Sequence, residues 1–344
     1  MKILEDSFIL DGCIFTAKSA ESDFVSNLLD SKLNACFFGV PHSQEGLKET
    51  ARSIGRIYNL ADNYNLADNC KQKLRIARSF EDFNKSSNDH YISLILTFQD
   101  PHSIGNSLEQ LRAVYELGVR VIQLTYNKAN YIGTGCTETI DRGLTDFGKQ
   151  IIHEMNRLGI VIDLSHCSKQ TACDALRESS MPVIYSHADV KSISNNPRNR
   201  TDEELKLLSE NGGVIGISPW GPLCWKKNKD EQPSLEDYLD HVDYVVNLIG
   251  INYVGFGSDI SIDGSEDKAG IKEQSMCYSS VVADYDKHVG FVDVEPEIRY
   301  AKNFKGIFEI ANLENALLKR GYSDSDISKF LGGNFLRVIK NVWK

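Results

Sequence analysis

Two Ser-His dipeptides, ending at His166 and His187, each follow a short apolar run that is typical of a buried strand, Ile160–Leu164 and Pro182–Tyr185. Residues just past the carboxyl ends of parallel strands share one rim of an α/β sheet, so we expect both imidazoles to face the same cavity. Two neutral imidazoles together with a carboxylate on the rim suit a zinc-type site. The repeat therefore predicts a metal site, although a single such His is more often a hydrogen-bonded residue beneath a loop.

Other side chains with useful chemistry stand near predicted strand ends. Asp259 follows the apolar run Tyr253–Phe256 and suits either a general base for an attacking water or the N-cap of a following helix. Arg198, eleven residues after His187, suits either a bidentate clamp on a substrate carboxylate or an ordinary surface position. The remaining side chains expected on the rim are Cys13, Phe15, Gln99, Tyr126, Pro219 and Trp220. The other six histidines, predicted to be structural, are His42, His90, His102, His153, His241 and His288.

The elements that must position these residues alternate between helix and strand. One helix is predicted to begin after Thr145 and end at Gly159, because four apolar residues share one of its faces: Phe147, Ile151, Met155 and Leu158. Ser168 is expected to cap the next helix, which reaches Glu178. A Ser or Thr that can serve as an N-cap also predicts helices after Ser107, Thr201, Ser234 and Ser323. An apolar face predicts a last helix over Asn334–Trp343.

Eight strand candidates alternate with these helices, which predicts a (β/α)8 TIM barrel of the metallo-dependent hydrolase type. They are Phe8–Leu10, Asn34–Phe38, Tyr91–Phe98, Val119–Leu124, Ile160–Leu164, Pro182–Tyr185, Val214–Ile217 and Tyr253–Phe256. The segment Glu45–Phe83 is expected to be mostly helical, and Gly264–Glu295 to be a long loop near the rim. No linker divides the chain, so we expect a single domain over residues 1–344 with C-terminal helices.

The composition argues against several classes of binding partner and indicates a cellular compartment. The net charge of −10 argues against nucleic acid and anionic membrane surfaces, and a cluster at Lys226, Lys227 and Lys229 is expected to be a solvated loop. The eight cysteines form no CxxC pair, which favours a reducing compartment. The N-terminal stretch has acidic residues where a signal peptide needs basic ones, and no run approaches a membrane span. We therefore expect a cytoplasmic protein.

Several strings resemble the renal (membrane) dipeptidase family of zinc hydrolases, among them GLTDFGKQIIHEMNRLGIVIDLSH, PVIYSHADV, NNPRNRTDEELK and YVGFGSD. The resemblance implies that His166 and His187 are metal ligands, Asp259 the catalytic base and Arg198 the residue that binds the substrate carboxylate. Tyr126 stands where some members carry a His that stabilises the oxyanion. Members of that family hold two zinc ions, and family resemblance also makes a homodimer plausible.

The chain departs from that pattern at three metal-binding positions. After its first strand the family reads HxD where this chain has Cys13 and Phe15, and Gln99 replaces the Glu that bridges the two zinc ions. A phenyl ring cannot coordinate, and a neutral amide brings no charge to offset two cations. The resemblance therefore implies one zinc ion at most, with Cys13, Gln99, Asp100 or Asp259 available as additional ligands.

Two functions remain open at this stage. The leading hypothesis is a metal-dependent hydrolase of dipeptide-like or N-acylated amino acid substrates with one metal on His166 and His187. The alternative is a catalytically inactive pseudo-dipeptidase that binds a small ligand or a protein partner. Covalent chemistry at Cys13 is a third hypothesis, which the sequence supports less because no His stands beside it.

Overall fold

A parallel sheet closed on itself forms the centre of the computed structural model, which describes residues 2–15, 28–29, 31–40, 46–65, 73–83, 91–225, 231–261 and 299–344. The strands follow the order β10-β1-β2-β4-β5-β6-β7-β8-β9. β3 is not part of this order and pairs with the first half of β4. Every pair is parallel. The bounds are β1 Leu10–Phe15, β2 Ala35–Gly39, β3 Lys73–Ile76, β4 Tyr91–Phe98, β5 Val121–Gln123, β6 Val161–Asp163, β7 Ile184–Tyr185, β8 Val214–Ile217, β9 Val254–Phe256 and β10 Ile260–Ser261.

The eighth barrel strand is split into two short pieces. β9 pairs with β8, whereas β10 pairs with β1, so the sheet closes only through the two pieces taken together. Asp259 lies in the break between them, with a left-handed backbone conformation (φ 54°). The predicted (β/α)8 barrel is therefore confirmed, with an irregular last strand at the position of a candidate site residue.

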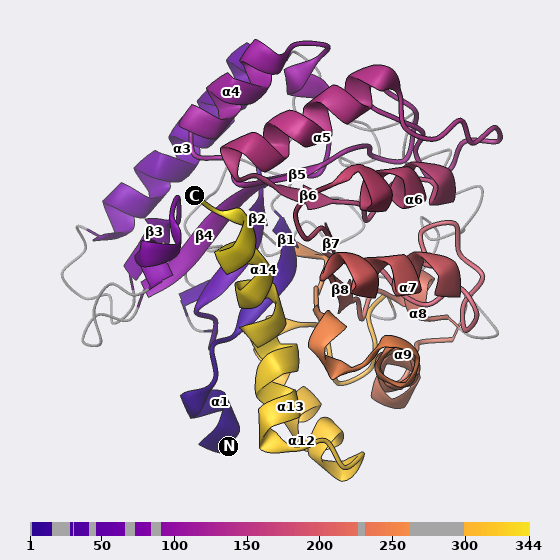
Figure 1. Cartoon of the computed structure of the whole chain (residues 1–344). Helices are drawn as coiled ribbons and strands as arrows, with labels where there is room; N and C mark the ends of the chain where they lie inside the picture. The colour runs from indigo at the N-terminus through magenta and orange to yellow at the C-terminus, as the bar shows by residue number, and fades with distance from the viewer. Residues whose placement is uncertain are drawn as a thin grey trace.

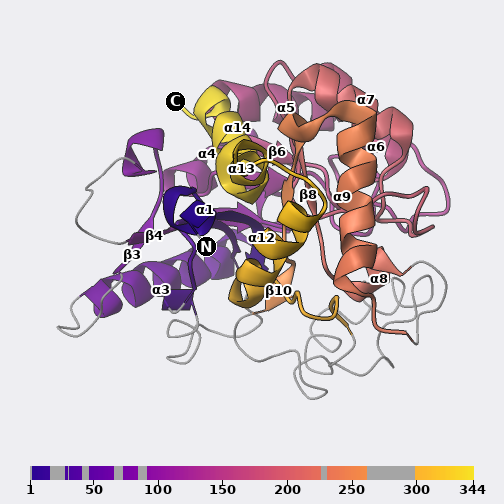
Figure 2. The same ribbon diagram turned by 90° about the horizontal axis from the view of Figure 1, so that it is seen from below.

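Helices surround the barrel in the predicted alternation (Figures 1 and 2). Their bounds are α1 Lys2–Asp6, α3 Leu47–Asn65, α4 Leu108–Glu116, α5 Asp146–Leu158, α6 Lys169–Glu178, α7 Asp202–Asn211, α8 Gly221–Cys224, α9 Leu235–Ile249, α12 Ile310–Lys319, α13 Asp324–Ser328 and α14 Asn334–Val342. The predicted capping box at Thr201 is present, and Gly159 ends α5 in the left-handed conformation. The Thr201 cap fixes where α7 starts, and Gly159 fixes where α5 ends.

One prediction about the strands was wrong, and another missed a short strand in a segment that also contains the predicted helix, α3. The first strand was expected to end at Asp11-Gly12, but β1 continues through Phe15, so Cys13 lies within the strand and not after it. Asp11 tolerates the interior because its Oδ1 accepts from the backbone N–H groups of Cys13 and Ser258. The segment predicted as helical after Glu45 contains β3, whose four residues are too few for a periodic signal.

The C-terminal helix α14 closes one end of the barrel. Phe335, Val338 and Val342 of α14 pack in one apolar cluster with the first residues of the barrel strands: Leu10, Ala35, Val121, Val161, Ile184 and Val214. These strand residues mark the amino-terminal end of the barrel, so the helix covers the end opposite the Ser-His rim. Figure 1 shows α14 lying across the strands.

Glycines leave the barrel interior open to main-chain atoms. A Cβ at Gly12, Gly216 or Gly257 would collide with the carbonyl oxygen of Ser186, which follows β7. The same added Cβ at Gly12 or Gly216 would press on the Phe335 ring. Gly12 on β1, Gly216 on β8 and Gly257 just after β9 therefore leave room for the Ser186 carbonyl inside the barrel.

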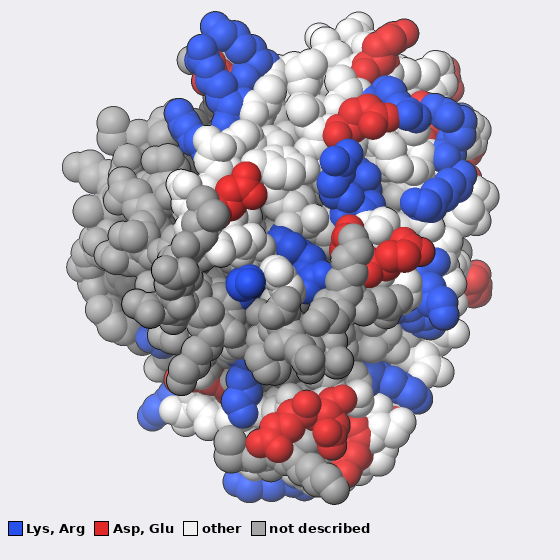
Figure 3. Space-filling model, turned by 90° about the vertical axis from the view of Figure 1, so that its left-hand side faces the viewer, with Lys and Arg blue, Asp and Glu red and all other residues white. Residues whose placement is uncertain are grey.

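The described surface carries both signs of charge. On the face shown in Figure 3, Lys and Arg side chains alternate with Asp and Glu. Within the described ranges, no helix combines the length and the hydropathy needed to cross a bilayer. The predicted loops at Lys226–Lys229 and Gly264–Glu295 lie outside the described residues.

Candidate metal and catalytic site

The structure brings the two histidines predicted to share a cavity into direct contact. His166 follows β6 and His187 follows β7, and their Nε2 atoms lie 3.1 Å apart. Both residues are buried. The expectation that the two Ser-His dipeptides converge on one rim is met in this geometry.

Neighbouring side chains determine which nitrogen of each ring carries the proton. His166 Nδ1 is 2.7 Å from Asn127 Oδ1, an acceptor, so Nδ1 must donate. Ser186 Oγ donates its proton to Asp163 at 2.5 Å and therefore accepts from His187 Nδ1 at 2.7 Å. In both neutral rings the proton is thus on Nδ1 and the lone pair on Nε2.

Asp163, at the end of β6, organises the pair. Its carboxylate accepts from the backbone N–H and the hydroxyl of both Ser165 and Ser186. Burial raises the pKa of Asp163, and these four hydrogen bonds oppose that rise. One buried carboxylate therefore holds both Ser-His dipeptides in register.

The two Nε2 lone pairs face each other, and this arrangement is repulsive unless a cation lies between them. Burial, and then the charges of Arg198 and Arg200, hold the pKa of His187 well below its usual range, so the His187 ring is neutral and its Nε2 keeps a lone pair. A divalent metal satisfies both lone pairs without charging either ring. The pair therefore fits a metal ion.

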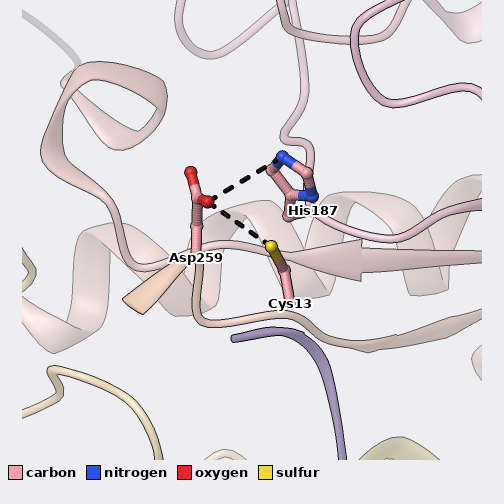
Figure 4. A group of neighbouring side chains, drawn as sticks. All are labelled: Cys13, His187 and Asp259. Atoms are coloured by element: carbon pink, nitrogen blue, oxygen red, sulfur yellow. Dashed lines mark hydrogen bonds and ion pairs between the residues drawn. The ribbon is translucent and has the colours of Figure 1, made fainter. Parts of the chain in front are cut away.

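Cys13 and Asp259 lie beside His187 (Figure 4). Cys13 Sγ is 3.5 Å from Asp259 Oδ1, which is 3.9 Å from His187 Nε2, and all three ligand atoms lie within 4.8 Å of one another. Zinc bonds of about 2.0 Å to nitrogen or oxygen and about 2.3 Å to sulfur place tetrahedral ligand atoms roughly 3.3–3.5 Å apart. The donor types therefore suit zinc, and the separation of Cys13 Sγ and Asp259 Oδ1 matches this spacing, whereas His187 Nε2 lies somewhat farther from Asp259.

Asp259 is positioned by its backbone and by a tyrosine. Its left-handed conformation is one that Asp adopts more readily than most residues, and Tyr300 donates from its hydroxyl to the Asp259 carbonyl at 2.7 Å. Burial raises the pKa of Asp259, while the charge of Arg198 lowers it. The carboxylate is thus held beside the metal-binding atoms in a conformation that costs some backbone energy.

Gln99 and Asp100 occupy places where the resemblance implied a bridging ligand. The amide nitrogen of Gln99 donates to Cys13 Sγ at 3.0 Å, so the nitrogen and not the oxygen faces the sulfur. Asp100 Oδ1 accepts from the backbone N–H of His102 and caps the turn that follows β4. The side chain of Phe15 lies outside the described part of the chain.

Arg198 is buried against the two ligand-bearing segments. Its Nε donates to the Ser165 carbonyl and its Nη2 to the His187 carbonyl, both at 2.9 Å. Within the described residues no group accepts from its Nη1, so that nitrogen keeps its donors. The guanidinium is therefore fixed beside Ser165 and His187 with part of its hydrogen-bonding capacity left.

Tyr126, predicted on the rim, stacks on the His166 ring. The Tyr126 and His166 ring centroids are 4.1 Å apart and the planes differ by 20°. This contact covers one face of the imidazole. Together with Asn127, it fixes the plane of the His166 ring.

A second cluster of polar residues lies deeper, where the sequence offered no pattern. Asp189, Cys224 and His241 are fully buried within 4.8 Å of one another. Cys224 Sγ donates to Asp189 at 3.1 Å, and His241 Nδ1 accepts from the backbone N–H of Val190 at 3.1 Å. The His241 lone pair at Nδ1 is therefore used by a backbone donor, which fits the predicted structural role.

The supporting residues Asp163, Asn127 and Ser186 were not singled out by the sequence reasoning. The signal for Asp163 was present, since an acidic residue at the end of the run Val161–Asp163 stands two positions before a repeated Ser. Asn127 lies in a loop, and its contact with His166 spans 39 residues, beyond any local pattern.

Comparisons with known proteins identify relatives of this chain. A family model described as membrane dipeptidase (peptidase family M19) matches residues 16–285. Dipeptidase verJ of Clonostachys rogersoniana is 33% identical over 307 residues, covering 89% of this chain and 68% of that protein. Dipeptidase tcpJ of Claviceps purpurea is 29% identical over 299 residues, covering 86% of this chain and 60% of that protein.

Solved structures share the whole barrel. An amidohydrolase from Pseudomonas aeruginosa superposes with a TM-score of 0.84 at 29% identity, covering 99% of this chain and 98% of that one. A dipeptidase of family M19 has a TM-score of 0.75 at 18% identity, over 98% of this chain and 99% of that one, and shows the shared fold. The chain therefore belongs to the membrane dipeptidase family, a family of peptide-bond hydrolases.

Proposed function

We propose that the protein hydrolyses the amide bond of dipeptide-like or N-acylated amino acid substrates, using a single metal ion, zinc, held by His166 and His187. The observation that carries the proposal is the pair of Nε2 atoms 3.1 Å apart, each with its lone pair directed at the other. The named relatives are themselves dipeptidases. When bound, zinc would supply the Lewis acidity that polarises a scissile carbonyl and activates water near neutral pH.

Asp259 is the proposed general base. Its buried carboxylate, which lies 3.9 Å from His187 Nε2, takes the proton of the attacking water and passes it to the leaving amine. Burial raises the pKa of Asp259 and so brings the carboxylate closer to the pKa of an efficient base at neutral pH. Its position in the strand break keeps the base on the rim.

Arg198 is the proposed carboxylate-binding residue. Two of its donors hold the backbone at Ser165 and His187, and Nη1 remains to bind the free carboxylate of a dipeptide or N-acylated amino acid. Tyr126, stacked on His166, flanks the same space and is the proposed donor to the developing oxyanion. A substrate bound this way would have its scissile carbonyl near the metal ligands.

Metal content and turnover test the proposal together. We expect about one equivalent of zinc after native purification, hydrolysis of a panel of dipeptides, and loss of that hydrolysis on chelation with recovery on adding zinc. Peptide hydrolysis by a metal-free protein would refute the metal mechanism. No turnover by the zinc-loaded protein across the panel would refute the hydrolase and leave the inactive pseudo-dipeptidase.

Substrate pairs and a restoring variant sharpen the test. Converting the substrate carboxylate to an amide should raise KM for the parent protein, and should matter much less after Arg198→Met. The triple change Cys13→His, Phe15→Asp and Gln99→Glu rebuilds the family pattern, and we expect it to bind two metal ions. Two ions in the parent protein would contradict the single-metal proposal.

A further inference from the structure

Cys13 and Gln99 stand where the family pattern has metal ligands, and here their side chains contact each other. Gln99 Nε2 donates to Cys13 Sγ at 3.0 Å across the rim between β1 and β4. The same sulfur is 3.5 Å from Asp259 Oδ1 and lies within 4.8 Å of a His187 ring nitrogen. Figure 4 shows the sulfur on the same side of Asp259 as the imidazole.

We propose that Cys13 is a thiolate ligand of the metal held by His166 and His187, and that Gln99 donates an N–H···S hydrogen bond to that thiolate. The inference rests on the metal centre of the proposed function and concerns its ligand set. The two departures from the family pattern, Cys13 and Gln99, then act together: the thiolate supplies negative charge to the metal, and the amide stabilises the thiolate.

The chemistry of the two side chains matches. Metal binding replaces the S–H bond of Cys13 by a sulfur–metal bond, and the proton leaves to solvent. The thiolate adds one negative charge beside two neutral imidazoles, and an amide N–H is the group that can donate to it. A carboxylate at position 99 would instead place a second anion 3 Å or so from the sulfur, which Coulomb repulsion opposes.

The surroundings of Cys13 favour a metal ligand over a free nucleophile. Reactive cysteines lie near cations that stabilise the thiolate. Cys13 Sγ instead contacts the Asp259 carboxylate, 3.5 Å away, and the Gln99 amide, 3.0 Å away. A cation bound at the sulfur would offset the negative charge of both the thiolate and that carboxylate.

The ligand set also selects the metal. Two imidazoles and one thiolate leave a fourth position open for water or substrate, as in catalytic zinc sites, and they favour Zn²⁺ or Co²⁺ over Mg²⁺ or Mn²⁺. Asp259 then remains available as a base.

Cobalt substitution tests the ligand set without measuring turnover. Co²⁺ titrated into the metal-free full chain should produce visible d–d absorption together with a near-ultraviolet thiolate-to-cobalt charge-transfer band. Cys13→Ser should abolish the near-ultraviolet band, retain visible absorption and weaken Co²⁺ binding at least tenfold. Cys36→Ser is the matched control, because Cys36 is also buried, on the neighbouring strand β2, and should keep both absorptions.

A second variant isolates the amide. Gln99→Met removes the N–H donor at similar length, so the charge-transfer band should persist but move to lower energy as the thiolate loses its hydrogen bond. An unmoved band would overturn the role of Gln99. The zinc-loaded parent protein should show one sulfur neighbour at about 2.3 Å by X-ray absorption, a measurement that needs no variant to fold.

Several outcomes would overturn the inference. They are failure to bind Co²⁺, d–d absorption without a charge-transfer band in the parent protein, a full band in Cys13→Ser, or an acyl group trapped on Cys13 during turnover. A clear charge-transfer band with no peptide hydrolysis would instead refute the proposed function alone.

Discussion

Ser186→Ala should weaken metal binding, whereas Ser165→Ala should not. Both hydroxyls are buried and donate to Asp163, at 2.5 and 2.6 Å. Each also accepts one N–H from His187, but Ser186 accepts from the ring Nδ1 and Ser165 from the backbone. Only the first of these contacts sets the tautomer that directs the Nε2 lone pair at the metal.

The magnitudes follow from those contacts. Each substitution removes one hydrogen bond to a carboxylate, which contributes about 1.5–3 kcal/mol, so the two metal-free variants should lose similar free energies of unfolding. Loss of an outer hydrogen bond to a ligating imidazole lowers metal affinity about 10–100-fold. We therefore expect Ser186→Ala alone to show that drop.

Two assays separate the effects. Urea unfolding of the metal-free proteins measures stability, and competition with a chromophoric chelator measures Zn²⁺ affinity. Equal Zn²⁺ affinities in Ser186→Ala and the parent protein would refute the tautomer argument. An equal drop in both variants would show that Asp163, and not the ring contact, controls the site.

Three further predictions concern the scaffold. Phe335→Ala should lower the free energy of unfolding by about 3–5 kcal/mol in a urea titration, because the ring is fully buried at the end of the barrel; a change under about 1 kcal/mol would contradict this packing. Gly257→Ala should reduce both the Zn²⁺ affinity and the free energy of unfolding, because the added Cβ would collide with the Ser186 carbonyl. Gly55→Ala in α3, where the added Cβ meets open space, should instead stabilise the protein by about 0.5–1 kcal/mol. Matching effects at both sites would refute the steric account. Arg320→Met should lower the free energy of unfolding by about 1 kcal/mol at low salt and by little in concentrated NaCl, because Arg320, at the end of α12, pairs with three carboxylates of α9. A stability loss that does not depend on salt in thermal unfolding would disprove an electrostatic origin.

The sequence predicted those parts of the fold that depend on local periodicity. β4 and β8 have the predicted bounds, and α5 begins and ends at the predicted Thr145 and Gly159. Strand-end logic then placed His166 and His187 on one rim, because parallel strands bring their carboxyl ends together.

What the sequence could not predict depends on contacts between distant segments. Asp11 and Gly12 have the composition of a turn, yet they lie within β1, because the Ser258 N–H donates to Asp11 Oδ1 and the Ser186 carbonyl needs the space at Gly12. The contact between Gln99 and Cys13 joins residues 86 positions apart, so no local pattern could show that the amide nitrogen faces the sulfur.

The packing of α14 affects when the barrel can be completed during synthesis of the chain. The apolar end of the barrel is completed by Phe335, which follows every barrel strand along the chain. While a ribosome is still making the preceding helices, the first residues of those strands lack the apolar contacts that α14 supplies, among them those to Leu10, Val121, Val161 and Val214. We therefore expect any chaperone dependence of the nascent chain to concentrate in the interval before α14 emerges.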